Sequence, residues 1–331
     1  MHVLQPVRRR RRRRIVWRRL TPVLLLGALA AIAGFLVAAR RPDPVAGPAS
    51  AARRAPASAA ARSARPARAT AARVGPLVTG PALIRTPLAG LKAATAIVVD
   101  DRSGRVLWAK RPHRRRQIAS TTKIMTALVA LPRLAPHAVV TVPPGAPRVP
   151  LVREGLRAGE QVEAWKLFYG LLLYSGNDDA LTLAVAAGGT RAHFLELMNA
   201  EAERLGLHDS HFTSTSGVID DGNYSSAWDL AALTRVAMRN ARFRAIVRRK
   251  RIEVPWAPPT NAKVYVNKNR MLTLYPGATG VKTGYTHRSG PCVVATATRH
   301  GDSLIAVVLD SSDEYGDATR LLDLGFRTMG A

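Results

Sequence analysis

The sequence predicts an α+β fold: an antiparallel β-sheet flanked by helices, with a helical lobe beside it. Two β-hairpin patterns, one near residue 100 and one near the C-terminus, predict the sheet. Between them, four segments carry apolar residues at helical spacing, and these predict the lobe. The chain has 331 residues, 47% of them hydrophobic, which is enough apolar material for a core. We expect a functional site between the sheet and the lobe.

The N-terminal part of the chain is set apart by charge and composition. Residues 1–19 are strongly basic and carry arginine at every position from 8 to 14, which predicts a cytoplasmic N-terminus. Residues 20–39 are apolar and uncharged, and they are long enough to span a bilayer. Residues 40–90 are rich in Ala, Arg, Pro and Ser without apolar periodicity, so we expect a disordered linker. The globular domain is then residues 91–331.

Two interpretations of the apolar segment 20–39 stay open. As a retained transmembrane anchor it would place the globular domain outside the cytoplasm on a single-pass membrane protein. As a cleaved signal segment, with small residues near 49–51 as the processing site, it would yield a secreted or periplasmic protein. Although the net charge is +28, the arginine run adjoins this apolar segment and has no interleaved aromatic residues, so we expect no nucleic-acid partner.

The first elements of the domain follow from short patterns. Residues 96–100 and 105–108 are apolar runs on either side of a turn that contains Gly104, and they predict a β-hairpin. A helix is predicted to begin at Ser120, because Ile124 and the apolar residues after it recur at helical spacing.

The lobe and the second hairpin follow in chain order. Amphipathic helices are predicted over residues 164–174, 178–187, 191–205 and 227–239. Strands are predicted over residues 280–286, 292–298 and 303–309. Cys292, the only cysteine, lies in one of these strands, so we expect a small buried residue and no intrachain disulfide.

Three short polar motifs stand next to these apolar elements. Ser120 and Lys123 lie three residues apart at a helix start, which places their Cβ atoms about 5–6 Å apart on one face. A serine hydroxyl needs a base to become a nucleophile, and a lysine can be that base only if its pKa is lowered. Burial and a second cation both lower it, and Lys282 supplies the cation if its motif folds against the first.

Each motif alone has an ordinary structural explanation. Ser-x-x-Lys can be a helix N-cap, the Ser175-Gly176-Asn177 motif can end a helix, and Lys-Thr-Gly at 282–284 can be a surface turn. The three together, in this order, indicate an acyl-transfer site built on one serine and two lysines.

With these motifs, residues 93–326 resemble the serine D-alanyl-D-alanine carboxypeptidases, the low-molecular-mass penicillin-binding proteins. The second motif differs from Ser-Asp-Asn by having Gly176 at its centre. Further similar segments lie at residues 198–199, 205–207, 224–230, 267–269 and 321–326. The resemblance implies a β-lactamase/transpeptidase-like fold, peptidoglycan stem peptides as substrate, β-lactam antibiotics as inhibitors, and no metal or organic cofactor.

The resemblance also implies roles for the motif residues. Ser120 attacks the carbonyl between two terminal D-alanines, Lys123 accepts its proton, and Ser175 passes a proton to the departing amine. Asn177 hydrogen-bonds the substrate amide and Lys123.

The third motif binds the other end of the substrate in the same scheme. Lys282 and Thr283 bind the terminal carboxylate, and Gly284 lets the substrate approach the strand. The backbone amides of Ser120 and Tyr285 form the oxyanion hole.

Several alternatives are weighed against this interpretation. A class A β-lactamase uses a Glu with an Asn four residues later, whereas Glu196 and Asn199 are three apart. A D,D-endopeptidase and an inactive wall-binding anchor stay possible. Relatives commonly carry an Arg where Glu314 stands, so the carboxylate contact is open to question. His208 and His211 have no accompanying ligands, and we expect no metal site.

Overall fold

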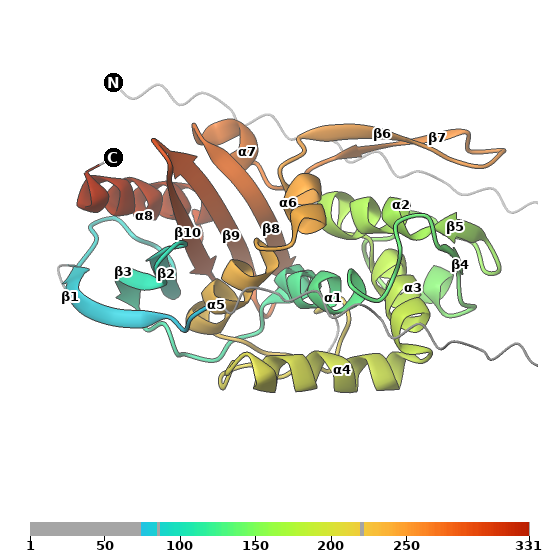
Figure 1. Ribbon diagram of the computed structural model, residues 1–331, viewed down its shortest axis with the longest axis horizontal. Coiled ribbons are helices and arrows are strands. Elements are labelled where there is room, and N and C mark those ends of the chain that lie inside the picture. The colour runs from blue at the N-terminus through green and yellow to red at the C-terminus, as the bar shows by residue number, and fades with distance from the viewer. Residues whose placement is uncertain (1–73, 85–86, 219–221, 331) are drawn as a thin grey trace, which may run out of the picture. The chain divides into compact units, whose positions relative to one another are not determined.

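The computed structural model describes residues 74–84, 87–218 and 222–330 (Figure 1). The predicted basic N-terminus, the apolar segment 20–39 and residues 40–73 of the predicted linker lie outside these ranges. Within them, none of the helices combines the length and the apolar character that a bilayer crossing requires.

A six-stranded sheet forms the centre of the domain, with strand order β1-β3-β2-β10-β9-β8. Its strands are β1 Val78–Ile84, β2 Thr95–Asp100, β3 Arg105–Lys110, β8 Ala278–Thr286, β9 Gly290–Arg299 and β10 Asp302–Leu309. All neighbours pair antiparallel except β1 and β3. Both predicted hairpins are confirmed, and β8, which carries the third motif, is an edge strand.

The predicted boundary between linker and domain is wrong. Strand β1 lies within residues 40–90 and pairs in parallel with β3, so the folded domain begins before residue 91. The sequence of β1 contains Gly80 and Pro81, which weaken a strand pattern. Such residues are tolerated here because β1 is an edge strand and has only one neighbour to pair with.

Helices surround the sheet and form the lobe beside it. They are α1 Lys123–Ala130, α2 Ala164–Tyr169, α3 Asn177–Gly188, α4 Arg191–Arg204, α5 Ala227–Ala237, α6 Ala241–Val247, α7 Met271–Leu274 and α8 Glu314–Met329. A short π-helical segment, Gly170–Tyr174, continues α2. The four predicted lobe helices are therefore confirmed within a few residues at each end.

Two small hairpins belong to the lobe side as well. β4 Val139–Thr141 pairs with β5 Gln161–Glu163, and β6 Arg251–Pro255 pairs with β7 Ala262–Val266. Figure 1 shows α1, α2 and α3 on the side of the sheet where β8 lies, with α8 near the other end.

The two faces of the sheet are both buried, but against different partners. In β10, Leu304, Ala306 and Val308 belong to the apolar cluster that contains α8, whereas Ile305 and Val307 belong to the larger cluster shared with the lobe. This alternation follows from the two-residue period of a strand. The sheet is therefore held rigidly between α8 and the lobe.

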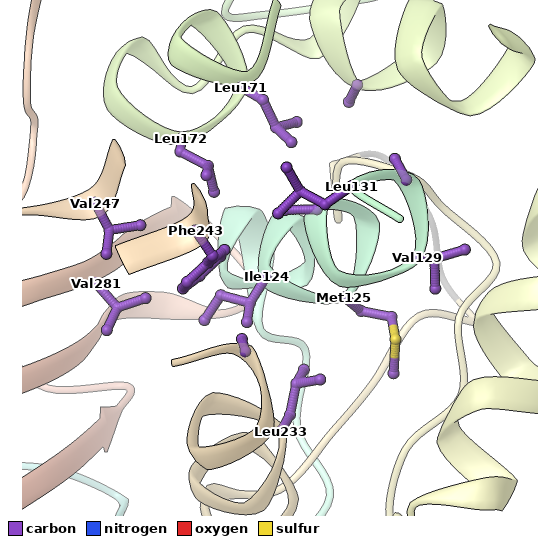
Figure 2. Packing of buried hydrophobic residues seen from close by; sticks show 14 of the residues in the cluster. Ile124, Met125, Val129, Leu131, Leu171, Leu172, Leu233, Phe243, Val247 and Val281 are labelled. Carbon is purple, nitrogen blue, oxygen red and sulfur yellow. The ribbon is translucent and has the colours of Figure 1, made fainter. Parts of the chain in front are cut away.

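Helix α1 lies at the centre of the larger cluster. Figure 2 shows buried side chains of α1 and of the elements packed around it. They are Ile124, Met125 and Val129 of α1, Leu171 and Leu172 of the π-helical segment, Leu233 of α5, Phe243 and Val247 of α6, and Val281 of β8. Burying each such side chain stabilises the fold by about 1.5–3 kcal/mol. Because α1 is enclosed in this way, the first motif is attached to a rigid element.

We expect the Phe243→Ala substitution to destabilise the domain by about 3–5 kcal/mol, because it removes a buried ring and leaves a cavity beside α1. Urea denaturation measures the free energy of unfolding. The matched control is Val266→Ala on β7, where the side chain is 60% exposed and the expected change is within about 0.5 kcal/mol. Equal losses in the two variants would contradict the described packing around α1.

Candidate active site

Ser120 stands in a tight turn rather than at the start of an α-helix. Residues Ala119–Thr122 form a 3₁₀ turn, and α1 begins at Lys123, so the predicted helix start is wrong by three residues. Ala119 adopts a left-handed φ of 46°, unusual for a residue with a Cβ. The hydroxyl of Thr121 donates to the carbonyl of Ile118 at 2.7 Å, which holds the turn. The turn presents the Ser120 side chain at a fixed place.

Lys123 is completely buried and joins the first two motifs. Its Nζ donates hydrogen bonds to Oγ of Ser120 at 3.0 Å and to Oδ1 of Asn177 at 2.7 Å. Ser120, Lys123 and Asn177 therefore form one hydrogen-bonded group, although they come from distant parts of the sequence.

The environment of Lys123 favours its neutral form. Burial is the largest cause and holds the pKa of Lys123 well below its ordinary value, and the charge of Lys282 lowers it further. The negative charge of Asp179 acts in the opposite direction, and the charge of Lys268 adds a smaller lowering effect. An uncharged amine has a lone pair, so it can accept the Ser120 proton across the existing 3.0 Å contact.

The second motif is held by a neighbouring segment of chain. Ser175 is buried and left-handed, with φ 73°, directly after the π-helical segment. The backbone amide of Asn177 donates to the carbonyl of Val152 at 2.8 Å, and its Nδ2 donates to the carbonyl of Pro150 at 2.8 Å. With its amide nitrogen fixed in this way, Asn177 directs Oδ1 toward Lys123.

The third motif lies on β8 and packs against the 3₁₀ turn Ala119–Thr122. A Cβ built on Gly284 would stand 2.8 Å from the backbone nitrogen of Ser120, so only glycine allows this approach. That side of Gly284 faces the turn, and the residue therefore allows the strand to approach the nucleophile. The next residue, Tyr285, is 60% exposed at the edge of the sheet.

Lys282 is buried beside the first motif. Its Nζ donates to the carbonyl of Thr283 at 3.0 Å. Burial, followed by the charge of Lys268, lowers the pKa of Lys282 to about 7. Lys268 carries a lowered pKa of its own because of burial, and its Nζ lies 4.3 Å from the ring centre of Tyr174. In the sequence, Lys268 stood out only as part of the segment 267–269, which resembles the family. Its effect on the pKa of Lys123 and of Lys282 was not predicted.

The remaining candidate residues lie outside this group of contacts. Glu314 is the first residue of α8. Asn199 donates to the carbonyls of Leu195 and Phe212, so it ties α4 to a neighbouring loop. His211 packs its ring against Tyr224, and the described ranges contain no set of three His, Cys, Asp or Glu side chains arranged to hold a metal.

Cys292 faces the core from β9, paired in register with Gly284. Burial raises the pKa of its thiol to about 12, which makes the residue unreactive. The prediction of a small buried residue is confirmed.

Comparisons with known proteins agree with this geometry. Residues 84–313 match the peptidase family S11, described as D-alanyl-D-alanine carboxypeptidase. The D-alanyl-D-alanine carboxypeptidase of Streptomyces sp. strain K15 is 34% identical over 281 residues, which cover 78% of this chain and 97% of that protein. DacB2 of Mycobacterium tuberculosis is 35% identical over 248 residues, which cover 72% of this chain and 84% of the relative.

The fold is shared with solved structures as well. The crystal structure of the Streptomyces K15 DD-transpeptidase superposes with a TM-score of 0.70 at 34% identity, covering 74% of this chain and all of that one. The fold of the neighbours and the order of sheet and helices confirm the predicted α+β class. The chain belongs to the D-alanyl-D-alanine carboxypeptidase family of serine peptidases.

Proposed function

We propose that this protein is a serine D,D-carboxypeptidase that removes the terminal D-alanine from peptidoglycan stem pentapeptides and is acylated by β-lactam antibiotics. The observation that carries the proposal is the 3.0 Å contact between Oγ of Ser120 and Nζ of Lys123, a buried amine whose pKa is lowered. Family membership supports the same substrate class, because the relatives are named D-alanyl-D-alanine carboxypeptidases.

The first half of the reaction forms an ester. Neutral Lys123 takes the proton from the Ser120 hydroxyl as the oxygen attacks the carbonyl carbon between the two D-alanines. Negative charge develops on the carbonyl oxygen, and the backbone amides of Ser120 and Tyr285 donate to it. The amide C–N bond then breaks. Protonated Lys123 gives a proton to Ser175 as Ser175 passes its own proton to the departing nitrogen, so D-alanine leaves as a neutral amine and Lys123 is uncharged again.

The second half releases the shortened peptide. A water molecule gives up a proton to Lys123 and attacks the ester carbonyl, and Lys123 returns that proton to the Ser120 oxygen as it leaves. Asn177 keeps Lys123 in place through both steps, because its Oδ1 accepts a hydrogen bond from the amine. No redox step and no further co-reactant are needed.

Binding of the substrate is assigned to the third motif. Lys282, as a cation, and the hydroxyl of Thr283 bind the terminal carboxylate of the peptide. Glu314, where relatives commonly carry an Arg, provides no positive charge, so we assign the cationic contact to Lys282. The anionic end of the peptide in turn favours the charged form of Lys282.

A second candidate function is transfer to an amine. The solved structures of the Streptomyces K15 relative are of a DD-transpeptidase, and in transpeptidation an amine takes the place of water. D,D-endopeptidase cleavage of crosslinked peptides uses the same acyl-enzyme chemistry. The three activities differ only in which group leaves and which group attacks.

We also propose that residues 20–39 anchor the protein in the membrane, with the catalytic domain outside the cytoplasm. The proposal rests on an uncharged apolar segment of bilayer length after a strongly basic one. Peptidoglycan substrates lie on that side of the membrane, which fits the orientation.

The central experiment incubates the purified full-length protein with a labelled penicillin, a stem pentapeptide and a crosslinked dimer. We expect covalent labelling and release of D-alanine from the pentapeptide, because Ser120 is the group acylated. Ser120→Ala should lose both, whereas Ser303→Ala, in β10, should keep both. Labelling that survives Ser120→Ala would refute the assignment of the nucleophile, and cleavage of the dimer alone would favour the endopeptidase.

The pKa of Lys282 predicts how substrate binding depends on pH. The amine is charged below about 7 and loses its charge as the pH rises. We therefore expect KM for the pentapeptide to rise above that pH, by up to about tenfold per pH unit. Steady-state kinetics between pH 6 and 9 measure this effect.

Two controls separate the charge from other effects of pH. Lys282→Arg stays charged over the whole range and should flatten the dependence of KM. A peptide with an amidated C-terminus has no carboxylate to bind and should show no rise. A rise in KM of equal size with the amidated peptide would contradict the assigned contact.

A further inference from the structure

Three buried acidic side chains that the proposed mechanism does not use lie behind the second motif. Asp178 and Asp179 occupy the first turn of α3 and are both fully buried. Glu154, from the segment that carries Pro150 and Val152, lies next to them and has a side chain only 2% exposed.

The two neighbouring aspartates have opposite environments. The carboxylate of Asp178 accepts hydrogen bonds from the backbone amides of Glu154, Gly155 and Leu156 at 3.0, 2.9 and 3.1 Å. Neither oxygen of Asp179 has a hydrogen-bond partner among the described residues. Burying a charged carboxylate without hydrogen-bond donors is strongly unfavourable in free energy, so the charged form of Asp179 is destabilised.

The carboxyl group of Glu154 lies next to that of Asp179. A Cβ built on Gly170 would stand 2.2 Å from Oε2 of Glu154 and 2.3 Å from Oδ1 of Asp179, so these two oxygens are neighbours. Two charged carboxylates facing the same small space would repel each other. Two carboxyl groups can share a hydrogen bond only if one of them carries a proton.

The proton belongs on Asp179. Burial raises the pKa of Glu154 as well, but Glu154 accepts hydrogen bonds from Nζ of Lys263 at 2.8 Å and from the hydroxyl of Tyr265 at 2.7 Å, and both favour its charged form. Asp179 has no such partner. Burial, then the charges of Glu154 and Asp178, raise the pKa of Asp179 well above its usual value, while the charge of Lys263 lowers it by less.

Asp179 affects the hydrogen-bonded group of Ser120, Lys123 and Asn177 in two ways. A Cβ built on Gly176 would stand 1.9 Å from Oδ2 of Asp179, so the carboxyl fills the space that a side chain at the centre of the second motif would need. Asp179 also acts on Lys123, because a negative charge on Asp179 raises the pKa of that amine. A neutral Asp179 fills the space and leaves the base uncharged.

We propose that Asp179 is a positioning residue that works as a neutral carboxylic acid, donating a hydrogen bond to Glu154 and so holding residues 175–177 against Lys123. The inference deepens the proposed function and rests on it for its catalytic consequence. It also accounts for the glycine at the centre of the second motif, because a larger residue there would collide with the Asp179 carboxyl.

The protonation state is tested first, without any activity assay. Infrared spectra of the full-length protein at neutral pH should contain the carbonyl band of a protonated carboxylic acid. Asp179→Asn should lose this band, and Glu203→Gln, an exposed acid on α4, should keep it. A wild-type spectrum without the band, or a band that survives in Asp179→Asn, would overturn the proposal.

Stability against pH gives a second readout. Because its pKa is raised in the folded protein, Asp179 makes the wild type lose stability as pH rises from the ordinary value of 3.8 toward the raised one. The amide of Asp179→Asn never ionises. The Tm of this variant should therefore rise relative to the Tm of the wild type as the pH increases across this range. A Tm difference that does not change with pH would contradict a raised pKa.

The positioning role is tested by the rate of acylation by penicillin. Asp179→Asn keeps a neutral donor and should stay within about threefold of the wild type, whereas Asp179→Ala loses the donor and should fall by about tenfold or more. As the pH rises through the raised pKa of Asp179, the wild-type rate should show a decline that the Asn variant lacks. Equal losses in the two variants would refute the role. If the wild type is not acylated at all, the proposed function fails while the spectra still decide the state of Asp179.

Discussion

The hydrogen bond between the Lys123 amine and the Ser120 hydroxyl is the interaction on which the rest of the site depends. It is useful only if the amine is uncharged, and in water a lysine amine at neutral pH is charged. The protein meets this condition by burying Lys123 completely inside a cluster to which α1, α5, α6 and β8 all contribute. The packing of the core therefore determines the pKa of Lys123. A looser core around α1 would let water reach the amine, which would then be protonated at neutral pH.

The charges around Lys123 are balanced rather than simply positive. Lys282 and Lys268 lower the pKa of the base, and Asp178 and Asp179 raise it. In the proposed mechanism Lys282 needs a positive charge to bind an anionic peptide end, yet its own burial brings its pKa to about 7. The carboxylate of the proposed substrate would stabilise the charged amine when it binds. The proton that we propose on Asp179 has the complementary effect behind the second motif, because it removes a negative charge near the base.

The sequence predicted much of the fold and the principal residues of the site because their signals are local. Each of these signals is contained in about a dozen consecutive residues. This holds for the amphipathic helices, the two hairpins and the three motifs. What it could not predict depends on contacts between distant segments. Strand β1 is defined by its pairing with β3. The effect of Lys268, and the contact of Glu154 with Asp179, arise only after the lobe has folded. Gly284 was recognised, but that it allows β8 to approach Ser120 is a property of the packed structure.

The most direct test of the account is the titration of Lys123 itself, followed by NMR of lysine labelled at Cε in the full-length protein. The Lys123 signal would be assigned by its loss in Lys123→Met. The account predicts that this amine releases its proton well below the ordinary value of 10.5, so that it is uncharged where the enzyme works. A Lys123 amine that stays protonated up to its ordinary value would contradict the central claim, because Ser120 would then have no base.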